Sequence, residues 1–382
     1  MILKKNIIYK FIFSILNFTL LFSEGVWVKY GWELYNYVVD AQTASLGNAV
    51  TAYNTNSIHS SLINPSFVSS NKNFSITHQS RFSGILNNDL FGIQLKSSSA
   101  PINLNFLYQG ISDIPDTRDM LLDWGLDGQF GTNDIGEGNG VIDEGERLNE
   151  EKLKFFNQHQ LGFHGAFKSN IFGLKLGLGL KLLGHFLDDH HAIGMGLDIG
   201  YSKKISKSTI GLVARDLPAS GLIWDSGTFE GTKPSLSFGL HHPIKYFEKI
   251  YLQINTMMNV DMSLSKTNLY SQIRYKNFSI DDAYGIELIY QKSTMIRFGR
   301  NTNNDTTGGI GLRWKNFGID YAFLSSLNNL SSKASLIPNI KLKKIKKILG
   351  KNTNNSVISG FYWGYIGPVS YTHLTLPTNR EV

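Results

Sequence analysis

Apolar and polar residues alternate with a period of two along most of the chain from about residue 73 onward. The clearest segment runs from Gly173 to Leu182, where every second residue is leucine and the residues between are glycine or lysine. Successive side chains of a strand point to opposite faces, so the leucines share one face and the glycines and lysines the other. The alternation recurs at 91–96, 193–201, 284–290 and 310–315. About 14 to 15 such segments of roughly ten residues predict an all-β fold.

The face opposite the apolar one is rich in glycine, lysine and glutamine. A transmembrane barrel has this arrangement, with a polar lumen and an apolar exterior, and its closure leaves no unpaired strand edge in a bilayer. We therefore predict a transmembrane antiparallel β-barrel of about 14 strands over residues 73–341. The alternative is a large soluble β-sandwich or propeller. Two regions break the pattern: residues 24–72 precede the first convincing strand, and residues 113–153 form a long acidic, glycine-rich insertion.

The N-terminus has the order of a secretory signal. Lys4, Lys5 and Lys10 come first, an apolar stretch follows from Phe11 to Phe22, and small residues come next. The apolar stretch is shorter than the ~20 residues that a membrane-spanning helix needs. The pattern predicts a signal peptide over residues 1–23 and export from the cytoplasm. A buried N-terminal helix is the alternative.

The formal net charge of +7 is concentrated in two places. Three lysines lie in the first ten residues and six between Lys341 and Lys351, which leaves the rest of the chain at about −2. A nucleic-acid-binding protein needs positive charge over its folded surface, so we expect no nucleic-acid partner. Residues 342–368 are predicted to be a basic tail of uncertain origin, either solvated or forming a basic amphipathic helix on a membrane surface.

One part of the insertion, residues 123–146, resembles a calcium-binding loop. Aligned with a twelve-residue EF-hand loop, Gly140 takes the glycine position, but Ile135 stands where the first ligand belongs. Oxygen ligands clustered among glycines suit Ca²⁺, because the chain must curl tightly around the ion. The candidate metal ligands are Asp134, Glu137, Asn139, Asp143 and Glu146. A solvated acidic loop is the alternative.

Catalytic chemistry has little support in the sequence. The chain has no cysteine, which excludes disulfides, thiolate metal sites and a cysteine nucleophile. It also lacks the Gly-x-Ser-x-Gly, His-Glu-x-x-His and phosphate-loop motifs. Asp188-Asp189-His190-His191 stands between two alternating segments and is interpreted as a polar turn. We predict a non-enzymatic protein without a cofactor other than the calcium ion considered above.

Two stretches resemble the PorV/PorQ family of bacterial outer-membrane barrels, within the FadL-like group. The first contains Gly31-Trp32-Glu33-Leu34, then Ala44-Ser45-Leu46-Gly47-Asn48-Ala49, and finally Asn64-Pro65-Ser66-Phe67. The second runs from Arg215-Asp216-Leu217 through Trp224-Asp225-Ser226-Gly227 to Pro234. The chain departs from the family pattern at Asn48 and at Ser66-Phe67.

The resemblance implies a barrel with residues 24–72 packed in the lumen as a plug, and Gly47, Ala49, Asn64 and Pro65 as its motif residues. It further implies an outer-membrane protein that serves type IX-like protein secretion or passage of hydrophobic solutes. The expected partners are outer-membrane lipid and secretion-system components or secreted proteins. A secreted, soluble β-rich protein for adhesion or surface structure is the alternative function.

The last residues differ in kind from the rest. Val369 to Thr378 shows neither strand nor helix periodicity and resembles the translation of a transposase-based sequencing adapter. We interpret residues 369–382 as such a translation and not as native protein.

Overall fold

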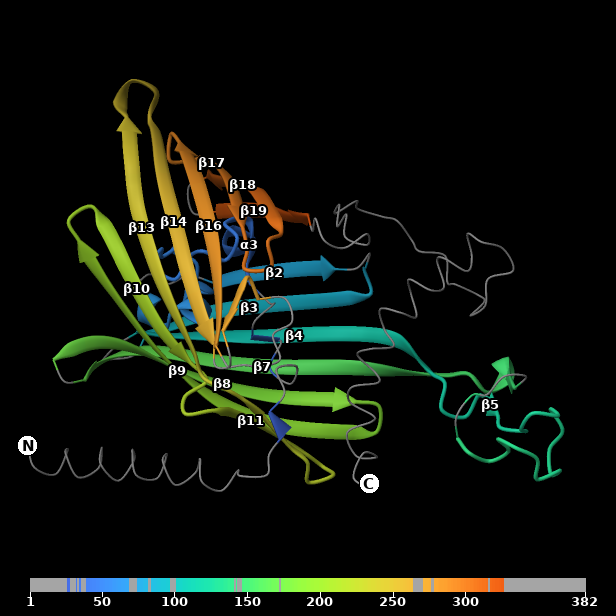
Figure 1. The fold of residues 1–382 in the computed structure, drawn as a ribbon. Helices are drawn as coiled ribbons and strands as arrows, with labels where there is room; N and C mark the ends of the chain where they lie inside the picture. The colour runs from blue at the N-terminus through green and yellow to red at the C-terminus, as the bar shows by residue number, and fades with distance from the viewer. Residues whose placement is uncertain are drawn as a thin grey trace, which may run out of the picture. The chain divides into compact units, whose positions relative to one another are not determined.

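The fold is taken from a computed structural model (Figure 1). It describes residues 26–27, 32, 34–35, 39–68, 74–81, 84–96, 101–140, 142, 146–171, 173–263, 271–275, 278–314 and 317–325. The predicted signal peptide (1–23), basic tail (342–368) and adapter-like end (369–382) lie outside these residues.

The chain divides into two compact units, which are considered separately. The first contains the described residues up to Gln109, together with Gln160–Phe186 and those from His190 onward. The second contains Gly110–His159 and Leu187–Asp189, and so holds most of the acidic insertion.

Nearly all regular structure is strand. The N-terminal half contains β1 (Val26–Trp27), β2 (Phe74–Arg81), β3 (Leu86–Lys96), β4 (Pro101–Asp116), β5 (Leu121–Leu122), β6 (Arg147–Leu148), β7 (Lys154–Ile171) and β8 (Leu174–Leu187). The C-terminal half contains β9 (His190–Ile205), β10 (Ser208–Arg215), β11 (Ser220–Trp224), β12 (Phe229–Thr232), β13 (Ser235–Phe247), β14 (Leu252–Ser263), β15 (Ile273–Tyr275), β16 (Phe278–Tyr290), β17 (Thr294–Arg300), β18 (Thr306–Trp314) and β19 (Phe317–Ser325). The helical pieces are short: α3 (Ala41–Ser45), α4 (Ser60–Ile63), η2 (Pro65–Phe67), η4 (Glu150–Lys152) and η5 (Glu248–Ile250).

All but two of these strands belong to one 17-stranded sheet, and β5 and β6 form a separate pair. From β10 the order follows the sequence to β19, continues with β2, β3, β4 and β7, and reaches β8 and β9. Long neighbours such as β13, β14 and β16 pair antiparallel side by side (Figure 1). The all-β prediction is confirmed. The sheet has more strands than predicted because it includes short strands, such as β1, β12 and β15. These are too short to show an alternation of apolar and polar residues in the sequence.

The distribution of polar and apolar side chains over the two faces of the strands is the reverse of that in an ordinary soluble protein. Side chains buried by the strands are largely polar or charged, among them Asn103, Gln160, Lys181, Asp198, Asn255, Glu287 and Arg297. Large apolar side chains on the same strands are exposed, among them Ile76, Phe91, Leu161, Ile193, Ile223, Phe298 and Ile319. Within the described part of the chain, no helix has the length and apolar character needed to cross a membrane.

Residues 39–68 lie against the polar side of the sheet and have almost no strand structure of their own. Asp40 caps α3, because its carboxylate accepts the backbone N–H of Thr43 at 2.8 Å. Asn64 caps η2 in the same way through the N–H of Ser66 at 3.0 Å, and Pro65 occupies the first turn. Local hydrogen bonds therefore set the path of this segment, which we call the N-terminal segment.

Glycines on eight strands give the N-terminal segment its close approach. A Cβ on Gly177 of β8 would lie 2.1 Å from the backbone of Pro65, and one on Gly211 of β10 would lie 2.1 Å from the carbonyl oxygen of Thr51. The other glycines that face this segment at less than 3 Å are Gly92, Gly200, Gly239, Gly285, Gly299 and Gly309. These positions alternate with apolar residues along their strands, so the glycine face found in the sequence is the face that the segment covers.

A small apolar core anchors the middle of the segment. Leu46, Ala49 and Val50 pack with Met257 of β14 and Ala283 of β16, and all five are nearly inaccessible to solvent. Tyr53 and Ile63 pack against the edge of this cluster. Most other contacts of the segment are polar, so its position depends on hydrogen bonds as well as on apolar burial.

We predict that Gly177→Ala destabilises the protein by about 1–3 kcal/mol, because the new methyl group meets backbone atoms that cannot move cheaply. Gly184→Ala on the same strand is the matched control. Its nearest neighbour would be the Phe186 ring at 3.4 Å, so little change is expected. Urea unfolding measures the free energy of unfolding of the two variants. Equal values would show that the N-terminal segment does not pack closely against β8.

Candidate functional site

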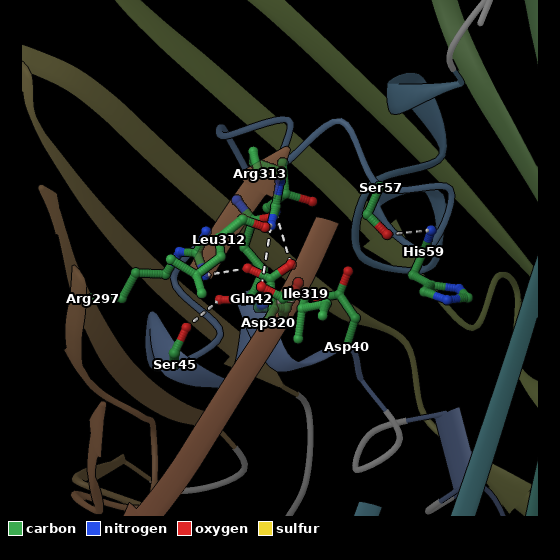
Figure 2. Close-up of polar contacts among 12 residues, drawn as sticks. Asp40, Gln42, Ser45, Ser57, His59, Arg297, Leu312, Arg313, Ile319 and Asp320 are labelled. Atoms are coloured by element: carbon green, nitrogen blue, oxygen red, sulfur yellow. Dashed lines mark hydrogen bonds and ion pairs between the residues drawn. The ribbon is translucent and has the colours of Figure 1, made fainter. Parts of the chain in front are cut away.

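The most highly charged part of the interior joins the N-terminal segment to β16–β19. The Arg297 Nε lies 2.8 Å from Glu287, and its Nη1 lies 2.6 Å from Asp320. Asp320 also pairs with Arg313 at 2.8 Å. Gln42 of α3 joins this group by accepting from Arg313 at 3.3 Å (Figure 2). Its amide also donates to Glu287 at 3.5 Å. The result is a network of two arginines and two carboxylates, in which Arg297 and Glu287 are buried and Arg313 and Asp320 are partly exposed.

Strand alternation explains how Arg297 enters the interior. Ile296 and Phe298, its neighbours on β17, are exposed, so Arg297 points to the opposite, polar side. Gly311 on β18 leaves room for the guanidinium, since a Cβ there would lie 2.8 Å from Nη2. The side chain is fully buried and Glu287 is 1 % exposed. Both charges are therefore held by their partners and not by water.

Tyr53 ties the N-terminal segment to this network. Its hydroxyl donates to Glu287, and burial, followed by the charge of Glu287, raises its pKa above the ordinary value. The tyrosine therefore stays neutral and keeps its donor proton. Both Gln42 and Tyr53 thus give the segment a direct bond to the carboxylate that holds Arg297.

A second buried group surrounds Lys181 of β8. Its ammonium lies 2.8 Å from Asp198 of β9 and pairs with Asp216 at 2.5 Å. Asp216 also accepts from the Ser220 hydroxyl at 2.6 Å. The rings of Trp32 and Tyr35 lie 5.9 Å and 5.6 Å from the ammonium. The charge is thus surrounded by two carboxylates and two aromatic faces.

A third group is neutral and centres on Asn105 of β4. Its side-chain oxygen accepts from His59 at 2.8 Å, and its amide donates to the Ser61 hydroxyl at 3.1 Å. His164 of β7 lies 3.4 Å from the same amide. Burial lowers the pKa of His59 against the opposing effects of Asp40 and Asn105, so the ring is neutral near pH 7.

These three groups share one chemical character. Each connects the N-terminal segment, or the residues just before it, to strands distant in sequence, and each has buried side chains at its centre. Buried charges that are mutually paired do not readily exchange protons with a substrate, and they hold their neighbours in one arrangement. The interior is therefore suited to positioning the segment.

The four motif residues lie in this interface. Gly47 has a φ of +64°, and a Cβ there would meet the backbone of Arg300 at 2.4 Å. Ala49 is 1 % exposed. The Asn64 amide donates to the Thr51 carbonyl at 2.8 Å, and Pro65 faces Gly177. These contacts describe where the residues lie; their functional role stays a prediction.

Three of the candidate calcium ligands accept hydrogen bonds from the backbone of the loop, which belongs to the second unit. The Glu137 carboxylate accepts from the N–H groups of Gly131 and Asn133, and Asp134 accepts from Asp127 at 2.8 Å. Glu146 accepts from Gly125 at 3.0 Å. Asp143 lies outside the described residues, and Asn139 is exposed.

Asp123, which is not among the predicted ligands, binds the loop most extensively. It accepts from Gly138, Asn139 and Gly140 at 2.7–3.3 Å. Among the residues that the structure describes, no group of three or more histidines and carboxylates is placed to hold a metal ion. Calcium binding by this loop stays a prediction.

His190 and His191 follow directly on the two-residue turn between β8 and β9. Both rings lie near Asp225, at 3.2 Å and 3.4 Å. The side chains of this pair are more than half exposed.

Comparison with known proteins points to a different family from the one the sequence motifs indicated. A protein-family model described as type III pantothenate kinase matches residues 323–373. A type III pantothenate kinase of Pelagibacter ubique is 34% identical over 131 residues, covering 32% of this chain and 49% of the relative. One from a Sulfurihydrogenibium species is 32% identical over 138 residues, covering 32% of this chain and 52% of the relative.

The chain thus spans about half the length of the curated relatives it matches. A third, from Koribacter versatilis, is 43% identical over 44 residues, 12% of this chain and 16% of the relative. The family-model match begins inside β19, and apart from Phe323–Ser325 it lies outside the described residues.

These matches overturn several of our predictions. The resemblance to the PorV/PorQ family is contradicted, because the family model and the curated relatives are type III pantothenate kinases. The predicted roles in secretion or solute transport, and in adhesion or surface structure, lose their support with it. So do the predictions of a non-enzymatic protein and of an outer-membrane location, since the matched proteins are kinases by name. Short motifs of small residues and an Asn-Pro turn were too general to identify a family.

We predict that Glu287→Gln destabilises the protein by about 3–5 kcal/mol, because it leaves Arg297 buried beside one carboxylate instead of two. Asp282→Asn is the matched control, because Asp282 pairs with the half-exposed Arg300 at 2.9 Å. That change should cost no more than about 1 kcal/mol. Urea unfolding at neutral pH measures both variants; a Glu287→Gln variant as stable as the control would mean that the network does not hold the fold together.

Proposed function

We propose that this chain takes part in ATP-dependent phosphorylation of pantothenate, and that the region containing residues 323–373 carries the kinase-related part. The observation behind this proposal is the identity of 34% over 131 residues to a type III pantothenate kinase, together with the family match at 323–373. Because about half of each of these relatives is covered, the activity of the whole relative is a proposal for this chain.

Phosphoryl transfer depends mainly on positioning the phosphates and on stabilising their charge. Of the three polar groups in the described residues, two have their charges paired internally and the third is neutral, and we assign none of them a part in that chemistry. The proposed division is therefore between an all-β region that supplies structure and a C-terminal region related to the kinase.

The test is formation of phosphorylated pantothenate from pantothenate and ATP by the purified full chain. A chain ending at Ser325, which keeps β19 and removes all but the first three residues of the family match, is the control. We expect product with the full chain and none with the shortened one. Absence of product with the full chain, or equal product with both, would contradict the proposal.

For the fold, we propose that the sheet closes on itself around the N-terminal segment, as a barrel around a plug. Support for closure comes from the pairing of β9 with β10, which joins strands near the two ends of the strand order. Support for the plug comes from the contacts that strands from β8 to β18 make with residues 45–66. A closed sheet would also explain why the glycine-bearing faces of so many strands converge on one short segment.

We further propose lipid acyl chains as the partner of the exposed apolar faces. Contiguous apolar surface larger than a few hundred Å² is rare on monomeric soluble proteins. Here neighbouring strands place such side chains together: Ile193 of β9 and Ile223 of β11 are register partners and are 71% and 54% exposed. Acyl chains would cover such a surface without requiring hydrogen-bonding groups.

Flotation of the purified chain with neutral phosphatidylcholine vesicles tests this partner. We expect the chain to float with the lipid, and Ile193→Ser with Ile223→Ser to lower the bound fraction, because two apolar side chains are lost from the face. Leu126→Ser with Ile135→Ser changes two equally exposed residues of the insertion and serves as the control. A chain that stays out of the vesicle fraction would contradict the lipid partner.

A further inference from the structure

One edge of the sheet in the first unit gathers lysines that have no acidic partner. Three hairpin turns meet there, joining β9 to β10, β13 to β14 and β16 to β17. The lysines on or beside these turns are Lys203, Lys204, Lys207, Lys245, Lys249 and Lys292. We call them the lysine edge. All six are exposed, and within the described residues none lies at ion-pair distance from a carboxylate.

Strand register places the three turns side by side. Ser208 at the first turn bonds His242 of β13 at 2.8 Å, just before Lys245. At the second turn the backbone oxygen of Tyr251 accepts from Gln291, which precedes Lys292 in the third. The six lysines therefore line one continuous edge, and Glu248 is the one acidic residue in the segments 203–207, 244–251 and 290–293.

Aromatic and apolar residues lie among these lysines. Tyr246, Tyr251 and Tyr290 are 48%, 59% and 46% exposed. Ile205, Ile244 and Ile250 are exposed to a similar extent. Tyrosines beside lysines, bordering an apolar face, are typical of protein surfaces at the boundary between hydrocarbon and lipid headgroups.

The opposite ends of these strands carry charges of both signs, because Arg215 ends β10 and Arg300 ends β17. Asp261 near the end of β14 is the register partner of Asp281 near the start of β16, and Asp282 follows. The turn between β17 and β18 contains Asp305. Acidic and basic residues are thus mixed at that end, whereas the lysine edge has one acidic residue among six lysines and suits an anionic partner.

We propose that the lysine edge binds the headgroups of anionic phospholipids. The proposal rests on the acyl-chain contact proposed above and adds a headgroup preference to it. Lysines near an anionic membrane surface attract it electrostatically, and the tyrosines beside them occupy the headgroup level. A nucleic acid or an acidic protein would use the lysines but would not require the adjoining apolar residues.

The experiment compares flotation at low salt with two kinds of vesicle. One is pure phosphatidylcholine, and in the other about 30% of the lipid by mole is phosphatidylglycerol. The proteins are the full chain, a variant with Lys203→Gln, Lys204→Gln and Lys207→Gln, and a control of equal charge change. The control carries Lys152→Gln, Lys154→Gln and Lys233→Gln, which are exposed lysines outside the edge.

We expect the full chain to bind the anionic vesicles more tightly than the neutral ones. Each lost lysine should reduce this preference by about fivefold at low salt, so that the edge variant loses on the order of 100-fold. The control should keep most of the preference, and 0.5 M salt, at a Debye length of roughly 4 Å, should suppress it in all three proteins.

Two results would overturn the headgroup proposal: equal loss in the edge variant and the control, or no preference for anionic vesicles in the full chain. A third result would also overturn it: poly-glutamate or duplex DNA releases the full chain from anionic vesicles, while the edge variant binds these vesicles as tightly as the full chain does. Failure of the acyl-chain contact is distinguishable, because it removes binding to the neutral vesicles in every protein.

Discussion

The structure depends on how closely the backbone of the N-terminal segment approaches the strands. Residues 45–66 touch strand positions where a single methyl group would collide with main-chain atoms, and glycines occupy those positions. Such closeness brings backbone carbonyls and amides within reach of strand side chains, as when Arg215 donates to the carbonyl of Ile63 at 2.7 Å. The apolar cluster around Leu46 is small, so this polar and close-packed interface holds most of the interior together.

The two arginine–carboxylate pairs illustrate what that interface demands. A guanidinium in the interior must have its charge matched and its donors used, or its burial costs several kcal/mol. Glu287 and Asp320 match the charge, and Gln42 and Tyr53 complete the bonds to Glu287 and Arg313 from the segment side. Removing the segment would expose a charged surface on β16–β19, so the sheet and the segment are expected to order together.

The sequence predicted the class of the fold because strand alternation is a local property. The leucine and glycine faces of 173–182 could be assigned from the residues alone, and the structure places Gly177 and Gly179 against Pro65 and its neighbours. The charged groups were not found in advance, although one signal was present. Lys181 is an even number of residues away from those glycines on the same strand, so its side chain lies on the same, interior face. Its partners are Asp198 on β9 and Asp216 in the connection after β10, and only the fold brings them together. Family assignment failed because the matched segment, 323–373, overlaps the end of the predicted barrel, the basic tail and the adapter-like end, where no site motif was recognised.

Several carboxylates in the described part of the acidic loop already have partners. Asp123 accepts three consecutive backbone N–H groups, from Gly138 to Gly140, and Glu137 accepts two more. The loop therefore has a defined shape that its own negative charges maintain, in the way that an anion organises a backbone nest. A cation entering this loop would have to take carboxylate oxygens away from the amides that hold them. Any response to such an ion would then be a change of loop conformation, visible in the backbone, and not the filling of a ready-made cage.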